Sequence, residues 1–304
     1  MKIISWNVNG IRAVEKKGFV NWLLNCGADI VCIQETKASP DKLSQELLNP
    51  GAQNSLKNDL QDYEDDEPLF APVIKQNAEN LKHAEDSQLA ENSKQNAIYN
   101  SYFQSAKKAG YSGSAIYSKI PCDKTENLGV QEFDDEGRCT ICYFEKNQKN
   151  KLAVISAYFP NSQDKGKRLD YKLRFCKAIY EKCNELVKSG YNIVLCGDYN
   201  IAHTPDDIAN PKQNEGNAGY LPEERQWMDF FLANGYTDTF RLFCKEGGHY
   251  SWWSYRTNAR ERNIGWRIDY LCVNNNFVPK VKSSTILTEI FGSDHCPVML
   301  ELEF

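Results

Sequence analysis

Eight short apolar runs limit what this chain can fold into more than any other feature of its sequence. Each is at most eight residues long and rich in β-branched and aromatic residues, and the eight are KIISW, DIVCI, SAIYS, CTICYF, LAVISAYF, NIVLC, IDYLCV and PVMLELEF. Such runs predict strands, whereas helical periodicity is limited to the ranges 12–25, 41–48, 168–189 and 223–234. We therefore expect a layered α/β or α+β domain with at least one substantial sheet.

The segment 51–96 does not follow this pattern. It contains ten of the 41 acidic residues and only four Lys, whereas the rest of the chain is nearly neutral, with 32 basic and 31 acidic residues. Its apolar residues are scattered and cannot build a core. We expect a polar, acidic insertion on a single domain that spans 1–304. A solvated spacer is favoured for this insertion over a polyanionic mimic that weakens the binding of an anionic partner.

Two segments are strongly basic. The range 165–177 has six Lys or Arg and one Asp, and 256–267 has four Arg and one Glu. Both are compatible with a nucleic-acid partner, although a solvated helix face or loop explains each of them equally well on charge alone.

The cysteines and the amino-terminal segment bear on the cellular compartment. Eleven Cys is an odd number, several lie inside apolar runs, and the single C-x-x-C at Cys139 and Cys142 has no second pair to complete a zinc site. This indicates reduced, mostly buried thiols in a cytosolic compartment. Because the sequence has neither an apolar span of membrane length nor a signal-peptide core, we expect a soluble protein without membrane contact.

Five apolar runs end in residues that bind metals, phosphates or protons. These residues are Asn7, Glu35, Tyr158 with Asn161 after it, Asp198 with Asn200, and Asp294 with His295. In extended backbone Asp198 and Asn200 point to the same side, and Gly197 allows the chain to turn out of the sheet. Each residue alone is more typical of an ordinary turn. Asp269, flanked by apolar residues, must pair with Arg267 or with a histidine if it is buried. Together the set fits metal-assisted phosphodiester hydrolysis.

The sequence blocks around these residues resemble one enzyme family closely. The blocks S-W-N-V-N-G-I-R-A, I-Q-E-T-K, G-Y-S-G, A-Y-F-P-N, C-G-D-Y-N-I-A-H, N-A-G-Y-L-P-E-E-R, N-I-G-W-R-I-D-Y and G-S-D-H-C-P-V are similar to the exonuclease III class of abasic-site endonucleases, within the endonuclease/exonuclease/phosphatase superfamily. They occur in the family's order along the whole chain, apart from the acidic insertion. The resemblance implies a four-layer αββα sandwich of two mixed β-sheets flanked by helices, like deoxyribonuclease I.

The resemblance also implies a metal site made of oxygen ligands. Glu35 is then the principal ligand, with Asn7 beside it and Asp294 as a further ligand. Such hard oxygen donors suit Mg²⁺, for which Mn²⁺ can substitute, and no Cys/His constellation suits zinc.

The catalytic residues follow from the same resemblance. Asp198 matches the residue that positions or deprotonates the attacking water, and Asn200 and Tyr158 match donors to the phosphate or the transition state. His295 paired with Asp269 matches the catalytic dyad. We favour a charged, stabilising imidazole over a general base, because Asp198 is the better-placed base and a neighbouring carboxylate raises the pKa of an imidazole.

The resemblance also implies a set of substrate-binding residues, and the support for them differs from residue to residue. Asn161 and Asn217 match residues of loops near the site, and Asn217 resembles a residue that helps to orient Asp198. Gln163 and Arg256 are expected to probe the DNA duplex from either side. The residues implied to form the walls of a pocket for a flipped, base-free deoxyribose are Trp252, Trp266 and Ile268. By composition alone these three are more typical of ordinary core.

The expected function is hydrolysis of the phosphodiester bond 5′ to abasic sites in double-stranded DNA, with 3′–5′ exonuclease or 3′-phosphodiesterase side activity. The superfamily core also serves other phosphoesterases, so a 3′-exonuclease, a DNA-uridine endonuclease and, more remotely, an inositol-phosphate phosphatase are the alternatives. A catalytically silent DNA-binding descendant is the alternative of a different class. We expect a monomer that is cytoplasmic if bacterial and nuclear if eukaryotic.

Overall fold

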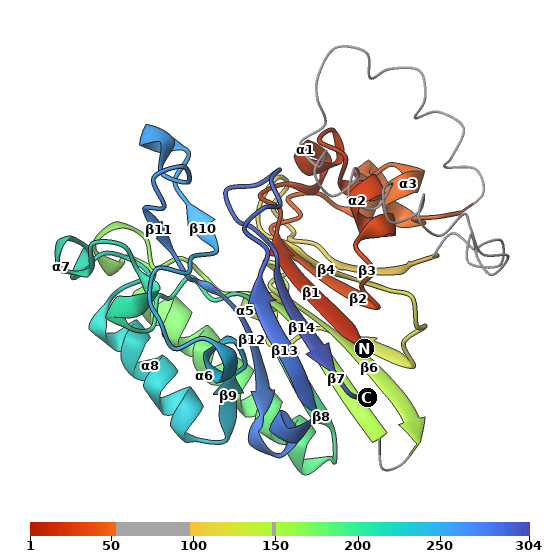
Figure 1. The fold of residues 1–304 in the computed structure, drawn as a ribbon. Coiled ribbons are helices and arrows are strands. Elements are labelled where there is room, and N and C mark those ends of the chain that lie inside the picture. The colour runs from red at the N-terminus through yellow and green to blue at the C-terminus, as the bar shows by residue number, and fades with distance from the viewer. Residues whose placement is uncertain (53–97, 148–149) are drawn as a thin grey trace, which may run out of the picture.

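Two β-sheets lie face to face with helices on their outer faces, as Figure 1 shows. The computed structural model describes residues 1–52, 98–147 and 150–304. Apart from its first two residues, the predicted insertion at 51–96 lies outside the described residues. The four-layer arrangement confirms the predicted fold class.

The first sheet has six strands in the order β13-β14-β1-β2-β4-β3. Only β1 and β2 run parallel, and the other neighbours are antiparallel. The strands are β1 (Lys2–Asn7), β2 (Ile30–Gln34), β3 (Asn100–Gln104), β4 (Ser114–Ser118), β13 (Val281–Ile286) and β14 (Val298–Leu302), and the helices beside them are α1 (Ile11–Glu15), α2 (Phe19–Asn25) and α3 (Gln45–Leu48).

The second sheet also has six strands, in the order β5-β6-β7-β8-β12-β9. Here β7 and β8 form the parallel pair. The strands are β5 (Lys124–Glu126), β6 (Cys139–Asn147), β7 (Asn150–Tyr158), β8 (Asn192–Asp198), β9 (Tyr236–Asp238) and β12 (Asp269–Asn274); the helices are α5 (Gln131–Asp134), α6 (Leu169–Lys188), α7 (Pro211–Asn214), α8 (Pro222–Ala233) and α9 (Phe240–Phe243). A separate hairpin pairs β10 (Trp252–Trp253) with β11 (Gly265–Trp266).

Alternate residues of the inner strands separate the layers of the core. In β1, Ile4 and Trp6 pack outward against the first helices, whereas Ile3 faces the other sheet. In β8, Leu195 packs outward against α6 and Val194 faces inward. The period of two along each strand therefore assigns every side chain to one of the two sheet faces.

The same alternation brings polar side chains to one end of the space between the sheets. Asn7 and Gln34 end two neighbouring strands and are paired in register. In the other sheet, Asp198 is paired with Tyr158 on one side and with Asp269 on the other. Because these positions continue the inward-facing apolar series, the five side chains enter one crevice.

The helices agree with the sequence periodicity in part. The predicted helix at 168–189 is α6, and that at 223–234 is α8 shifted by one residue. The predicted helix at 12–25 is instead two short helices, because Gly18 adopts a left-handed conformation with φ of 89° and starts α2 anew. Within the described ranges, no helix combines the length and apolarity needed to cross a membrane.

Candidate active site

Asp198 is fixed at the end of β8 by donors from two asparagines. Asn7 Nδ2 lies 2.9 Å from Oδ2, the backbone N–H of Asn200 lies 2.8 Å from Oδ1, and Asn200 Nδ2 lies 3.1 Å from Oδ2. The sharp turn depends on Gly197, where a Cβ would lie 1.9 Å from the carbonyl oxygen of Ala157. Burial raises the pKa of Asp198 to about 7, with a further increase from Asp269 that His295 and the amide donors oppose.

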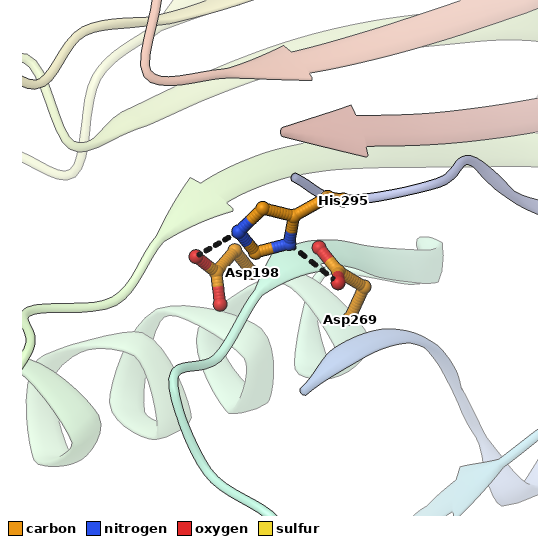
Figure 2. A group of neighbouring side chains, drawn as sticks. All are labelled: Asp198, Asp269 and His295. Carbon is orange, nitrogen blue, oxygen red and sulfur yellow. Dashed lines mark hydrogen bonds and ion pairs between the residues drawn. The ribbon is translucent and has the colours of Figure 1, made fainter. Parts of the chain in front are cut away.

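His295 and Asp269 form a buried dyad. His295 Nδ1 lies 2.8 Å from Oδ2 of Asp269 (Figure 2). Ser251 Oγ donates to the same oxygen at 2.6 Å. Of the two partners considered for Asp269, the structure thus brings the histidine to it. Arg267 instead pairs with Asp207, with 2.6 Å between Nε and Oδ1.

The imidazole lies between two carboxylates. Figure 2 shows its Nε2 turned toward Asp198, 3.9 Å from Oδ2, while Nδ1 faces Asp269. Burial lowers the pKa of His295, but Asp269, Asp198 and Asp294 outweigh burial and raise that pKa to about 10. The ring therefore carries a positive charge at neutral pH, which suits electrostatic stabilisation of a phosphate better than proton abstraction.

Two sets of donors could hold a metal ion. The dyad and Asp198 offer ligand atoms within 4.8 Å of one another, but an imidazolium between two carboxylates already balances their charge. The other set is Glu35 and Asn7, whose oxygens match what Mg²⁺ prefers. The Glu35 side chain is 17% exposed, which leaves room for the waters that Mg²⁺ retains. The second set therefore fits the cation better.

Lys37 lies beside Glu35. Its Nζ is 3.4 Å from Oε1 of Glu35 and also donates to Asn9 Oδ1. Asn9 in turn donates to Asp294 Oδ1 at 2.9 Å. Asp294 is thereby tied to the Glu35 side of the crevice through Asn9. Burial raises the pKa of Asp294, but His295 together with the hydrogen bonds from Trp252 and Asn9 outweighs burial and lowers that pKa below its usual value.

The residues predicted to donate to the phosphate lie close to Asp198 and Glu35. Asn161 Nδ2 donates to Asn200 Oδ1 at 3.0 Å. Burial, with added repulsion from Glu35 and Asp198, raises the pKa of Tyr158 well above its usual value, so its hydroxyl stays protonated. Arg138, which the sequence did not single out, donates to the backbone oxygen of Tyr158 at 3.0 Å and lies under its ring.

The aromatic residues implied to recognise the deoxyribose form one cluster next to the dyad. Trp252 and Trp266 are paired across the β10–β11 hairpin, with their ring centres 5.9 Å apart. Ile268 belongs to the same cluster, which is closed from below by Tyr220 and Ile208. Trp252 also donates to Asp294 Oδ2 at 3.1 Å, and its ring centre lies 6.5 Å from that of His295.

Three predicted substrate-binding residues lie on exposed loops. Gln163 precedes α6 and Arg256 follows the β10 strand, and both are solvent-exposed. Asn217 does not reach Asp198, because its side-chain amide donates to Asn214 Oδ1 at 3.1 Å instead. The structure therefore does not bring Asn217 to Asp198, whose hydrogen bonds come from Asn7 and Asn200.

A buried ion pair under the active site was missed by sequence reasoning. Lys172 and Glu224 have completely buried side chains 2.7 Å apart. Lys172 Nζ also donates to the backbone oxygen of Asn200 at 2.6 Å, and Ser162 Oγ donates to Glu224 at 2.6 Å. The pair thus ties the loop after β7 to the loop after β8. The two residues of this ion pair are far apart in sequence. The one signal in the sequence that could have indicated the pair is a Lys placed on the apolar face of a predicted helix.

Comparisons with known proteins agree with this geometry. The sequence profile of the Endonuclease/Exonuclease/phosphatase family matches residues 4–295. An exodeoxyribonuclease of Bacillus subtilis (strain 168) is 37% identical over 99% of this chain and 98% of its own length. A DNA-(apurinic or apyrimidinic site) endonuclease of Dictyostelium discoideum is 30% identical over 98% of this chain and 69% of its own. Among solved structures, the Xenopus laevis APE2 catalytic domain has a TM-score of 0.71 and 27% identity, covering 99% of this chain and 91% of that one.

Proposed function

The chain belongs to the endonuclease/exonuclease/phosphatase family, and from that premise we propose that it cleaves the phosphodiester bond 5′ to abasic sites in duplex DNA. It is a DNA repair nuclease, since its full-length relatives are an exodeoxyribonuclease and an abasic-site endonuclease. The observation that carries the finer assignment is the aromatic cluster of Trp252, Trp266 and Ile268 directly beside the His295–Asp269 dyad.

The proposed mechanism uses Asp198 as the group that aligns and deprotonates the attacking water. Its two asparagine partners fix the carboxylate, and a pKa near 7 matches a general base that works at neutral pH. The water attacks phosphorus, the bond to the 3′ oxygen breaks, and the proton passes to Asp198. His295, held cationic by Asp269, stabilises the charge that develops on the phosphate oxygens.

Glu35 and Asn7, with Asp294 through Asn9, would hold Mg²⁺ or Mn²⁺. When bound, this ion supplies Lewis-acid stabilisation of the phosphate and of the leaving oxygen. Tyr158, Asn161 and Asn200 would supply neutral donors to the phosphate. A catalytically silent descendant is disfavoured, because every residue type that the chemistry needs is present and positioned.

The pocket beside the dyad would select the substrate. Two half-buried indoles set edge to face and a buried Ile268 make a rigid, apolar wall suited to a bare deoxyribose and too close for a nucleoside. Gln163 and Arg256 would contact the duplex from either side, with Arg256 also near phosphate.

Processing of 3′ ends is the second candidate, and the relative named exodeoxyribonuclease favours it. A monomer is sufficient, since all the proposed catalytic groups come from one chain. All eleven cysteines are free thiols, which supports a reducing compartment that contains DNA, the cytoplasm of a bacterium or the nucleus of a eukaryote.

Incision assays on four duplexes test this proposal. They carry, respectively, one abasic site, a 3′-phosphate, an undamaged blunt end and a uracil, and each is incubated with the full chain and Mg²⁺. We expect the abasic strand to be cut on its 5′ side at least ~10²-fold faster than the uracil strand. Equal cutting of both would contradict the abasic-site assignment, and the Asp198→Asn variant controls for contaminating nucleases.

A further inference from the structure

A cavity lies along the β10–β11 hairpin, lined by Trp253 and not by Trp252 or Trp266. Its volume is about 730 Å³, and it is bounded by the hairpin tip, the β13–β14 connection and Lys17, which follows α1. Figure 1 shows that the hairpin and this connection both extend beyond the sheets at the same end of the molecule. The cavity reaches Ser293 and Asp294, so it opens beside the catalytic crevice.

The cavity walls are joined by Arg260. Its guanidinium lies 4.7 Å from the ring centre of Trp253 on the hairpin and 4.1 Å from that of Phe291 on the connection. It also donates to the backbone oxygens of Thr288 and Ile290, at 2.8 and 2.6 Å. The cavity is therefore formed before any ligand binds, because one side chain holds its two walls together.

Two exposed aromatic rings stand at the mouth of this cavity. Tyr255 is 67% exposed and Phe291 is 42% exposed, and partial burial of the Tyr255 hydroxyl, with added repulsion from Asp294, raises its pKa. Aromatic rings left open to solvent next to a concave site are typical of surfaces that bind a ligand.

The charges around the cavity indicate which part of a nucleic acid it would take. Lys17 and Arg260 are balanced by Glu261 and Asp294, so the walls do not form an anion site. Flat aromatic rings beside a guanidinium suit the face of a nucleobase, because every base offers a π-surface for stacking. The cavity is large enough for one base with its sugar.

We propose that this cavity holds an unpaired nucleobase from the DNA strand that passes the catalytic crevice, stacked on Tyr255 and Phe291. The inference rests on the proposed function, and it extends the substrate class to DNA with an unpaired nucleotide next to the cleaved bond, such as a frayed end. The base-free sugar and the unpaired base would occupy separate sites along one hairpin.

The test separates base stacking from attraction to phosphate. Two labelled single strands of about ten units are compared by fluorescence anisotropy in EDTA, one of deoxyadenosine nucleotides and one of abasic deoxyribose phosphates with the same charge. We expect the wild-type chain to bind the strand with bases at least about fivefold more tightly. Tyr255→Ala and Phe291→Ala should each remove most of that preference, and Tyr255→Phe should keep it.

The control is Phe243→Ala, which removes a ring that is 52% exposed on α9 and should leave the preference unchanged. A preference that persists in both cavity variants, or that falls equally in the control, would overturn the proposal. Incision of the abasic duplex is measured on the same proteins. If the wild type does not cut the abasic duplex, the proposed function is contradicted. The proposal for the cavity is decided by the preference for the strand with bases alone.

Discussion

Nε2 of His295 lies 3.9 Å from Oδ2 of Asp198, on the opposite side of the imidazole from Asp269. A cation is thus held between two buried carboxylates, and only one of them, Asp269, is in hydrogen-bond contact with it. Nε2 of the ring and the carboxylate of Asp198 face each other at the crevice. In the proposed mechanism, this arrangement separates the water-activating group from the charge-stabilising group, and the predictions below depend on that separation.

Replacing Asp198 by Asn should abolish turnover while DNA binding is kept. The amide preserves the shape of the side chain but cannot take a proton from water, so we expect kcat to fall at least ~10³-fold. Affinity should persist or increase, because an anion facing the phosphate is neutralised. Single-turnover kinetics and a binding titration in Ca²⁺ measure the two effects; parallel losses of both would show that Asp198 mainly supports the fold.

The proposed roles of His295 and Asp269 predict which of their substitutions lowers kcat more. Asp269→Ala leaves the imidazole in place but removes its orientation and much of its charge, whereas His295→Ala removes the ring itself. We therefore expect a smaller loss of kcat for Asp269→Ala, and little additional loss in the double variant. A more severe effect of Asp269→Ala than of His295→Ala would show that Asp269 acts through some other partner.

The charge of His295 can be measured directly. In metal-free protein, NMR titration of its ring should give a pKa near 10, far above the value of about 6.5 for a free imidazole. Because the folded-state pKa is raised, its stabilising contribution is fully present below pH 6.5 and is lost as the pH rises through about 10. His295→Gln should accordingly flatten the fall in unfolding free energy over that window. A ring that titrates near 6.5 would refute the stabilising role.

Glu35 should determine the dependence on metal. Glu35→Ala removes the principal carboxylate of the proposed oxygen site, so we expect the rate to drop at least ~10²-fold and to recover in part at high Mg²⁺. The matched control is Glu132→Ala on α5, an exposed carboxylate that pairs with Arg174. Wild-type activity that continues in EDTA would exclude the metal site altogether.

Much of the fold and site follows from local sequence, because period-two alternation places Asn7, Asp198 and Asp269 on inward faces at strand ends. The edge strands β3 and β13 could not be predicted from local sequence, because their sequences NSYFQ and VKSSTI bury few apolar side chains and lack the pattern of a central strand. These segments form strands because they pair with neighbouring strands.

The contacts that support the site could not be predicted for a related reason. Ser251 reaches Asp269 across 18 residues, and Lys172 reaches Glu224 across 52. Charge alone allowed the basic segment 165–177 to be a nucleic-acid contact or a solvated face, yet Lys172 is completely buried. Local charge patterns do not reveal which cation has a distant carboxylate to pair with, and that pairing is what makes burial of the cation tolerable.

Selectivity for abasic sites tests the central claim most directly. The measurement is the ratio of abasic-site incision to degradation of undamaged duplex, determined for the wild type, Trp252→Ala and Trp266→Ala, with melting temperature as the control for damage to the core. Removing either indole enlarges the pocket, so we predict that the ratio falls at least about tenfold while hydrolysis of the abasic strand is reduced much less. A ratio that stays at the wild-type value, with only the melting temperature lowered, would contradict the account and return both tryptophans to a structural role.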